Sequence, residues 1–184
     1  QIISIGPKIG QELTNSAKYA IILSLILIGF YITIRFDRYY ALGSIAALIH
    51  DVLITLGLFS LFNIEISITI IAGLLTIVGY SLNDTIVIYD RIRENFIKMY
   101  DSEKNIIVNR SLNETLNRTF ITSVTTLMVV IILFFYGGDV LVPFSLTLII
   151  GILIGTYSSI FVASPIMLYL ETKYPISETN LEED

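Results

Sequence analysis

Five long apolar runs constrain the fold of this chain more than any other feature. They lie at about residues 17–34, 39–62, 64–89, 118–136 and 140–170. Each has roughly the 20 residues that a helix needs to cross the hydrocarbon core of a bilayer. Because lipid offers no hydrogen-bond partner to a free backbone amide, each run must be helical. The sequence therefore predicts an all-α, polytopic membrane protein whose five transmembrane helices form one bundle.

The composition supports this class. Hydrophobic residues make up 54% of the chain and charged residues only 15%, whereas a soluble domain carries about 25% charged residues. The absence of cysteine and the presence of one histidine, His50, argue against disulfides and against thiolate or multi-histidine metal sites. The net charge of −5 argues against nucleic acid as a partner. We expect no catalytic residues, no metal and no cofactor.

The Lys and Arg residues between the runs predict the orientation. They occur between the first two runs, in the loop 90–117 and after the last run, whereas the turns FNIEI and GGDVLVP have none. We therefore expect these basic segments in the cytoplasm, an extracytoplasmic lead-in at 1–16, a bundle at 17–171 and an acidic cytoplasmic tail at 172–184. The chain starts with QIISIGPKIG, without an initiator Met or a signal-peptide pattern, so we expect a longer protein.

The loop 90–117 contains apolar residues at helical spacing. Ile92 and Phe96 share a helical face, and Val108, Leu112 and Leu116 recur every four residues. The first set continues the third run by a turn or two, and the second set leads into the fourth run. We therefore expect a pair of short amphipathic helices on the cytoplasmic surface, which a cytoplasmic partner could also contact.

Ionisable groups inside apolar spans are costly and usually mark an ion or proton path. The candidates are Asp84, Arg118 and, with less support, Asp51 beside His50. Asp84 lies six residues before Asp90, about 9 Å inside the cytoplasmic edge. Arg118 opens the fourth run from the same side, so the two groups can meet. A proton at Asp84 would neutralise the carboxylate and release Arg118, and loss of the proton would restore the pair.

Structural roles remain open for each of these residues. Arg118 could pair with Glu114 one turn earlier, Asp84 could form hydrogen bonds with Asn83 and Ser81, and His50 with Asp51 could be a polar packing pair.

Stripes of small and hydroxylated residues indicate which helix faces point inward, because small residues let membrane helices approach closely. Such stripes accompany Asp51, Asp84 and Arg118, the last through Thr122 and Thr125 or Thr126. The fifth run adds Gly151, Gly155, Ser159 and Ala163 at strict four-residue spacing. We expect all of these faces inside the bundle.

Several stretches resemble the SecD/SecF family of protein-export membrane proteins, in particular the membrane region of its SecF branch. They are SIGPKIGQEL, RFDRYYALGSIAALIHDVLITLG, GYSLNDTIVIYDRIRENF, LNRTFITSVTTLMVVIILFFYGG and FSLTLIIGILIGTYSSIFVASPI. The resemblance covers nearly the whole chain. It implies that a first span and a periplasmic domain precede these residues in the longer protein.

The resemblance also implies a function. It places the chain in a proton-driven SecD–SecF complex of the resistance-nodulation-division superfamily, in the inner membrane of bacteria. This complex assists the SecYEG channel and the ATPase SecA in moving preproteins. The resemblance implies that Asp84 and Arg118 belong to the proton path and that a further carboxylate comes from SecD. The sequence does not distinguish H⁺ from Na⁺ as the coupling ion.

Three alternatives differ in class. An exporter of drugs or lipids from the same superfamily would carry large extracytoplasmic substrate domains. An intramembrane aspartyl protease would use Asp51 and Asp84 as a pair that shares a proton, although GYSLND lacks the Gly-x-Gly-Asp signature of that family. A purely structural subunit would couple to no ion.

Overall fold

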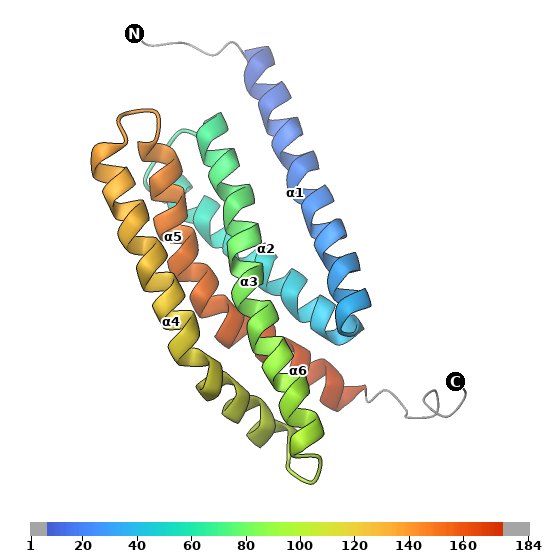
Figure 1. The fold of residues 1–184 in the computed structure, drawn as a ribbon. Coiled ribbons are helices and arrows are strands. Elements are labelled where there is room, and N and C mark those ends of the chain that lie inside the picture. Colours follow the sequence, from blue (N-terminus) through green and yellow to red (C-terminus); the bar gives the residue numbers. More distant parts are fainter. Residues whose placement is uncertain (1–6, 175–184) are drawn as a thin grey trace.

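The computed structural model describes residues 7–174, and these residues form helices joined by short turns (Figure 1). The helices are α1 (Pro7–Arg35), α2 (Arg38–Leu61), α3 (Ile68–Lys98), α4 (Lys104–Tyr136), α5 (Val142–Ser158) and α6 (Ser164–Lys173), and a π-helical turn, η1 (Ser159–Ala163), joins α5 to α6. Five helical segments, of which α5–η1–α6 is the last, are long and apolar enough to cross a membrane. The predicted all-α fold with five candidate spans is therefore confirmed.

Helix α3 is the centre of the bundle. It packs against α5, α4, α2 and α1, and in Figure 1 it stands between α1 on one side and the α4–α5 pair on the other. Helix α1 is the most peripheral of the spans, because only 11% of its apolar window is buried, against 50% for α3. A polar site placed on α3 is therefore surrounded by protein on most sides.

Residues 90–117 continue the third and fourth spans, as their apolar spacing indicated, but form no separate short helices. They extend α3 and α4 as two continuous helices, which turn at 99–103. Contacts across the pair explain why both helices persist beyond the apolar runs. Arg91 donates to Glu114 over 2.6 Å, Asn95 donates to Ser111 over 3.0 Å, and apolar side chains such as Ile92 are buried beneath these bonds.

The fifth run also departs from a single regular helix. Pro165 lies in the first turn of α6 and has no N–H with which to continue the α-helical ladder. The chain widens into the π turn η1 just before it, and the Ser164 hydroxyl donates to the carbonyl oxygen of Ser159 over 3.0 Å. Such single π turns inside α-helices are rare and occur frequently at functional sites.

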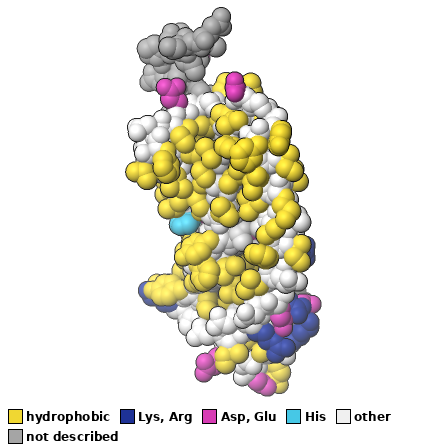
Figure 2. Space-filling model, turned by 90° about the vertical axis from the view of Figure 1, so that its left-hand side faces the viewer, with side chains coloured by type: hydrophobic (Ala, Val, Ile, Leu, Met, Phe, Trp, Pro, Cys, Tyr) yellow, Lys and Arg dark blue, Asp and Glu magenta, His cyan; other side chains and the backbone are white. Residues whose placement is uncertain are grey.

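The surface separates into an apolar body and a charged end. In Figure 2, hydrophobic side chains cover most of the visible face, and the acidic and basic side chains gather mainly at its lower end. That end includes the α3–α4 turn, the α1–α2 junction and the end of α6 (Figure 1). The basic segments used to predict the orientation thus lie at one end of the bundle.

Candidate functional site

A layer of buried polar groups joins α2 to α3 in the middle of the bundle. Asp51 on α2 is fully buried. Its Oδ2 atom accepts a hydrogen bond of 2.6 Å from the Ser81 hydroxyl on α3, and its Oδ1 atom lies 3.1 Å from His50 Nδ1. The predicted pairing of His50 with Asp51 is therefore observed, but the Ser81 hydroxyl donates its hydrogen bond to Asp51 and not to Asp84.

The polar layer continues from α3 to the fifth span. The Thr85 hydroxyl lies 2.9 Å from the Ser159 hydroxyl, and the Ser159 hydroxyl is 3.0 Å from the carbonyl oxygen of Gly155. Thr85 did not figure among the predicted site residues. Its position four residues after Ser81 is the sequence signal that could have identified it.

The small-residue stripe of the fifth span lies against α3. A Cβ atom on Gly151 would stand 2.0 Å from Ile77 Cδ1, and one on Gly155 would stand 2.9 Å from the Ser81 Cβ. Ser159 and Ala163 are also buried. The structure therefore brings the four stripe residues to the helix interface, with no room for a larger side chain at the two glycines.

Asp84 is buried on α3 without a hydrogen-bond partner for its second oxygen. The residue is 2% exposed, and its Oδ2 atom has no partner among residues 7–174. The predicted structural alternative, hydrogen bonds to Asn83 and Ser81, is not observed, because the Ser81 hydroxyl is turned to Asp51 and Asn83 is exposed. An unpartnered carboxylate oxygen in an apolar span is energetically costly.

Arg118 lies on the neighbouring helix α4 and is exposed. It lines a hollow of about 520 Å³ together with Val87, which follows Asp84 by one turn. Among the residues that the structure describes, no Arg118 nitrogen is within 4.0 Å of a carboxylate oxygen, so no Asp84–Arg118 ion pair is formed. The alternative pairing with Glu114 is also absent, because Glu114 is bound by Arg91, Asn95 and Arg110.

The inward face of α4 agrees only in part with the predicted one, because its most buried residues lie one position later in the chain. We expected Arg118, Thr122 and Thr125 or Thr126 inside. Arg118 and Thr125 are exposed, whereas Thr122 and Thr126 are half-buried, and the Tyr80 hydroxyl on α3 donates to the Thr126 hydroxyl over 3.4 Å. The hydroxylated residues that α4 buries are Ser111, Thr115, Thr119 and Ser123. Both sets are hydroxylated at helical spacing, and adjacent helical residues point about 100° apart, so the pattern alone could not separate them.

The geometry limits the chemistry of the buried acids. Asp51 and Asp84 form no hydrogen bond with each other, so the shared proton of an aspartyl protease pair is not present in this structure. In the described part of the chain, no group of three or more His, Asp and Glu residues could hold a metal ion.

Comparisons of the sequence identify relatives over nearly the whole chain. The family model for protein export membrane protein SecD/SecF, C-terminal, matches residues 1–173. The protein translocase subunit SecF of Rhodothermus marinus is 55% identical over 92% of this chain and 57% of its own length. The SecF subunit of Vibrio alginolyticus is 54% identical over 90% of this chain and 53% of its own length. The chain thus spans somewhat more than half the length of these relatives.

Two solved structures share the fold. The crystal structure of SecDF from Thermus thermophilus, a translocon-associated membrane protein, superposes with a TM-score of 0.85 and 48% identity, over 91% of this chain and 23% of the solved chain. SecDF in its super-membrane-facing form gives a TM-score of 0.77 over 81% of this chain and 20% of the solved chain. Sequence and structure together show that the chain belongs to the SecD/SecF family of protein export membrane proteins.

Proposed function

We propose that the protein acts as the SecF subunit of a complex with SecD, which uses the proton gradient across the bacterial inner membrane to assist protein export. In this role it would support the SecYEG channel and the ATPase SecA as they move preproteins. The names of the SecF relatives and of the SecDF structures support this assignment.

The observation that carries the proposal is the state of Asp84. A carboxylate that is 2% exposed, with one oxygen unpartnered in the described residues, is a group whose charge can change when a proton arrives or leaves. Arg118 lies near the same end of the α3–α4 pair, so a small displacement of α4 or a partner helix can alter its influence on Asp84. Protonation is thereby linked to helix arrangement.

The outward face of α3 supports a helical partner. It exposes Ala72, Thr76, Gly79 and Asn83 at alternating spacings of three and four residues, and a Cβ atom on Gly79 would meet nothing within 4 Å. In a membrane, such small and polar faces favour close packing with another helix. SecD is the partner that we propose for this face, and one of its carboxylates would complete the Asp84–Arg118 site.

The decisive experiment is export by the full-length complex with and without an ionophore. Asp84→Asn should abolish the part of export that depends on the gradient and leave the ATP-driven part intact. Asp101→Asn, a change of the same type in the exposed α3–α4 turn, is the matched control. Normal gradient-dependent export in Asp84→Asn would reject the mechanism. Replacing the proton gradient with a sodium gradient identifies the coupling ion.

A further inference from the structure

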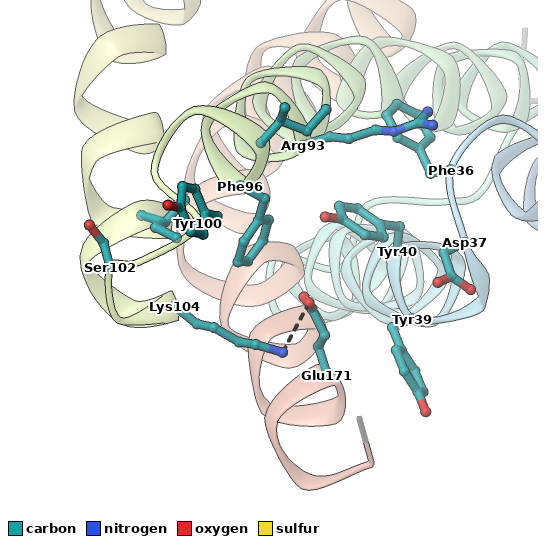
Figure 3. Close-up of a pocket in the computed structure, with 12 residues that line it drawn as sticks. Phe36, Asp37, Tyr39, Tyr40, Arg93, Phe96, Tyr100, Ser102, Lys104 and Glu171 are labelled. Carbon is teal, nitrogen blue, oxygen red and sulfur yellow. Dashed lines mark hydrogen bonds and ion pairs between the residues drawn. The ribbon is translucent and has the colours of Figure 1, made fainter. Parts of the chain in front are cut away.

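A second hollow, of about 590 Å³, lies at the charged end of the bundle, away from Asp84. Its lining comes from the α1–α2 junction, the extended end of α3, the start of α4 and the end of α6. Figure 3 shows these residues around one space: Phe36, Asp37, Tyr39, Tyr40, Arg93, Phe96, Tyr100, Ser102, Lys104 and Glu171.

Some polar groups of this hollow have hydrogen-bond partners, and others have none in the described part of the chain. Lys104 Nζ lies 3.2 Å from Glu171 Oε1, yet Glu171 Oε2 is buried and has no partner among residues 7–174. The Tyr40 hydroxyl points into the same space (Figure 3) and forms no hydrogen bond within the described part of the chain. The hollow therefore offers two oxygen acceptors to a donor-rich cation, next to the aromatic ring of Phe96.

The same hollow also contains positive charge. Arg93 pairs with no carboxylate of the described residues and donates only to the carbonyl oxygen of Arg35, over 3.3 Å. Lys104 retains donors beyond the one that it uses on Glu171. A ligand with an ammonium group and a phosphate group would match both charges at once, whereas a simple anion or a simple cation would match only one.

The hollow lies at the expected boundary between membrane and water. The candidate spans Asn15–Arg35 and Val142–Lys173 end beside it, and the span Arg38–Leu61 begins there. Its aromatic residues, among them Tyr39 and Tyr40, are of the type that gathers at the level of lipid headgroups. This position favours a lipid over a soluble ligand.

We propose that this hollow binds the headgroup of an aminophospholipid, with the ammonium at Glu171 and Tyr40 and the phosphate at Arg93 and Lys104. The ammonium of phosphatidylethanolamine has N–H donors for both oxygens. The trimethylated ammonium of phosphatidylcholine has none and should bind less well, although its charge is the same.

The test is native mass spectrometry of the delipidated, full-length protein in its complex. Dioleoylphosphatidylethanolamine or dioleoylphosphatidylcholine is added at equal concentration. We expect about tenfold tighter binding of the ethanolamine lipid, the equivalent of one charge-assisted hydrogen bond. Glu171→Gln removes the negative charge, so it should weaken binding of both lipids and reduce the preference. Tyr40→Phe removes only an acceptor, so it should reduce the preference and leave binding of the choline lipid unchanged. Tyr40→Phe retains the aromatic ring, so the lipid preference can be measured in this variant even if Glu171→Gln does not fold.

Two matched controls lie at the opposite end of the bundle. Glu65→Gln and Tyr136→Phe make the same chemical changes at exposed positions and should retain the full preference. Equal binding of the two lipids to the unmodified protein, or an unchanged preference in Glu171→Gln, would overturn the proposal. Glu171-dependent binding of a tetra-arginine peptide, with no lipid preference, would instead assign the hollow to a basic protein segment and also overturn it.

Discussion

The Ser81 hydroxyl donates a 2.6 Å hydrogen bond to the carboxylate of Asp51, which is fully buried between α2 and α3. Ser81 also lies against Gly155 of the fifth span, so one residue connects three helices. Asp84 follows Ser81 by one turn and obtains no hydrogen bond from it. The two buried acids therefore differ: the Asp51 carboxylate is bound by protein groups, and the Asp84 carboxylate is left available to bind a proton.

Removal of the Ser81 hydroxyl should destabilise the bundle. Ser81→Ala leaves one Asp51 oxygen unpaired in the interior, and we expect a loss of about 1.5–3 kcal/mol in the free energy of unfolding. Ser145→Ala is the control, because the buried Ser145 hydroxyl donates only to the carbonyl oxygen of Leu141, the residue just before its own helix. Denaturant titration in detergent measures both variants. Equal losses in the free energy of unfolding for the two variants would mean that the hydrogen bond to Asp51 stabilises the bundle no more than the bond of Ser145 does.

A methyl group at Gly151 should also destabilise the bundle. Its Cβ atom would fall 2.0 Å from Ile77 Cδ1, and such overpacking costs about 1–3 kcal/mol. The same titration should show that Ile77→Ala lowers the free energy of unfolding less in the Gly151→Ala background than in the unmodified protein. The reason is that the methyl group added at 151 fills part of the volume that is lost at 77. Gly57→Ala, where the new methyl meets nothing within 4 Å, should cause no loss. Additive effects at 151 and 77 would contradict this packing.

The sequence predicted the helical spans well, because their apolar runs are long and uninterrupted. It indicated that apolar faces within residues 90–117 continue the adjacent spans. It did not indicate that both helices run unbroken to the turn at 99–103, since bonds such as Arg91–Glu114 join residues 23 positions apart. The π turn depends on how the chain accommodates Pro165 within a packed helix. Likewise, the choice of Ser81 between Asp51 and Asp84 depends on the packing of α2 against α3, which spacing along one helix does not reveal.

The orientation of the helices can be tested with single cysteines, because the chain contains none of its own. Cysteines at Glu65 and Asp139, both exposed in turns at one end, should react with an impermeant thiol reagent in intact cells. A cysteine at Asp101, in the α3–α4 turn, should react only after the membrane is opened. Labelling at position 101 in intact cells would reverse the predicted orientation.

A double-mutant cycle in the full-length complex separates two roles for Arg118. The residue is exposed and forms no ion pair with a described residue, so Arg118→Gln should change the stability of the isolated subunit by less than about 0.5 kcal/mol. It should nevertheless abolish gradient-dependent export, because Arg118 is the proposed counter-charge of Asp84. If the two residues act as one unit, Asp84→Asn combined with Arg118→Gln should be no worse than either change alone.

Glu114→Gln is the control for that cycle. Glu114 lies one turn before Arg118 but is bound by Arg91, Asn95 and Arg110. Its loss should loosen the α3–α4 extension, seen as faster hydrogen exchange near 99–103, while gradient-dependent export persists. Export measured with and without ionophore distinguishes the outcomes. If export by Arg118→Gln keeps its full dependence on the gradient, Arg118 is not part of the proton path. If export by Glu114→Gln loses that dependence, the cytoplasmic extension of α3 and α4 takes part in the coupling.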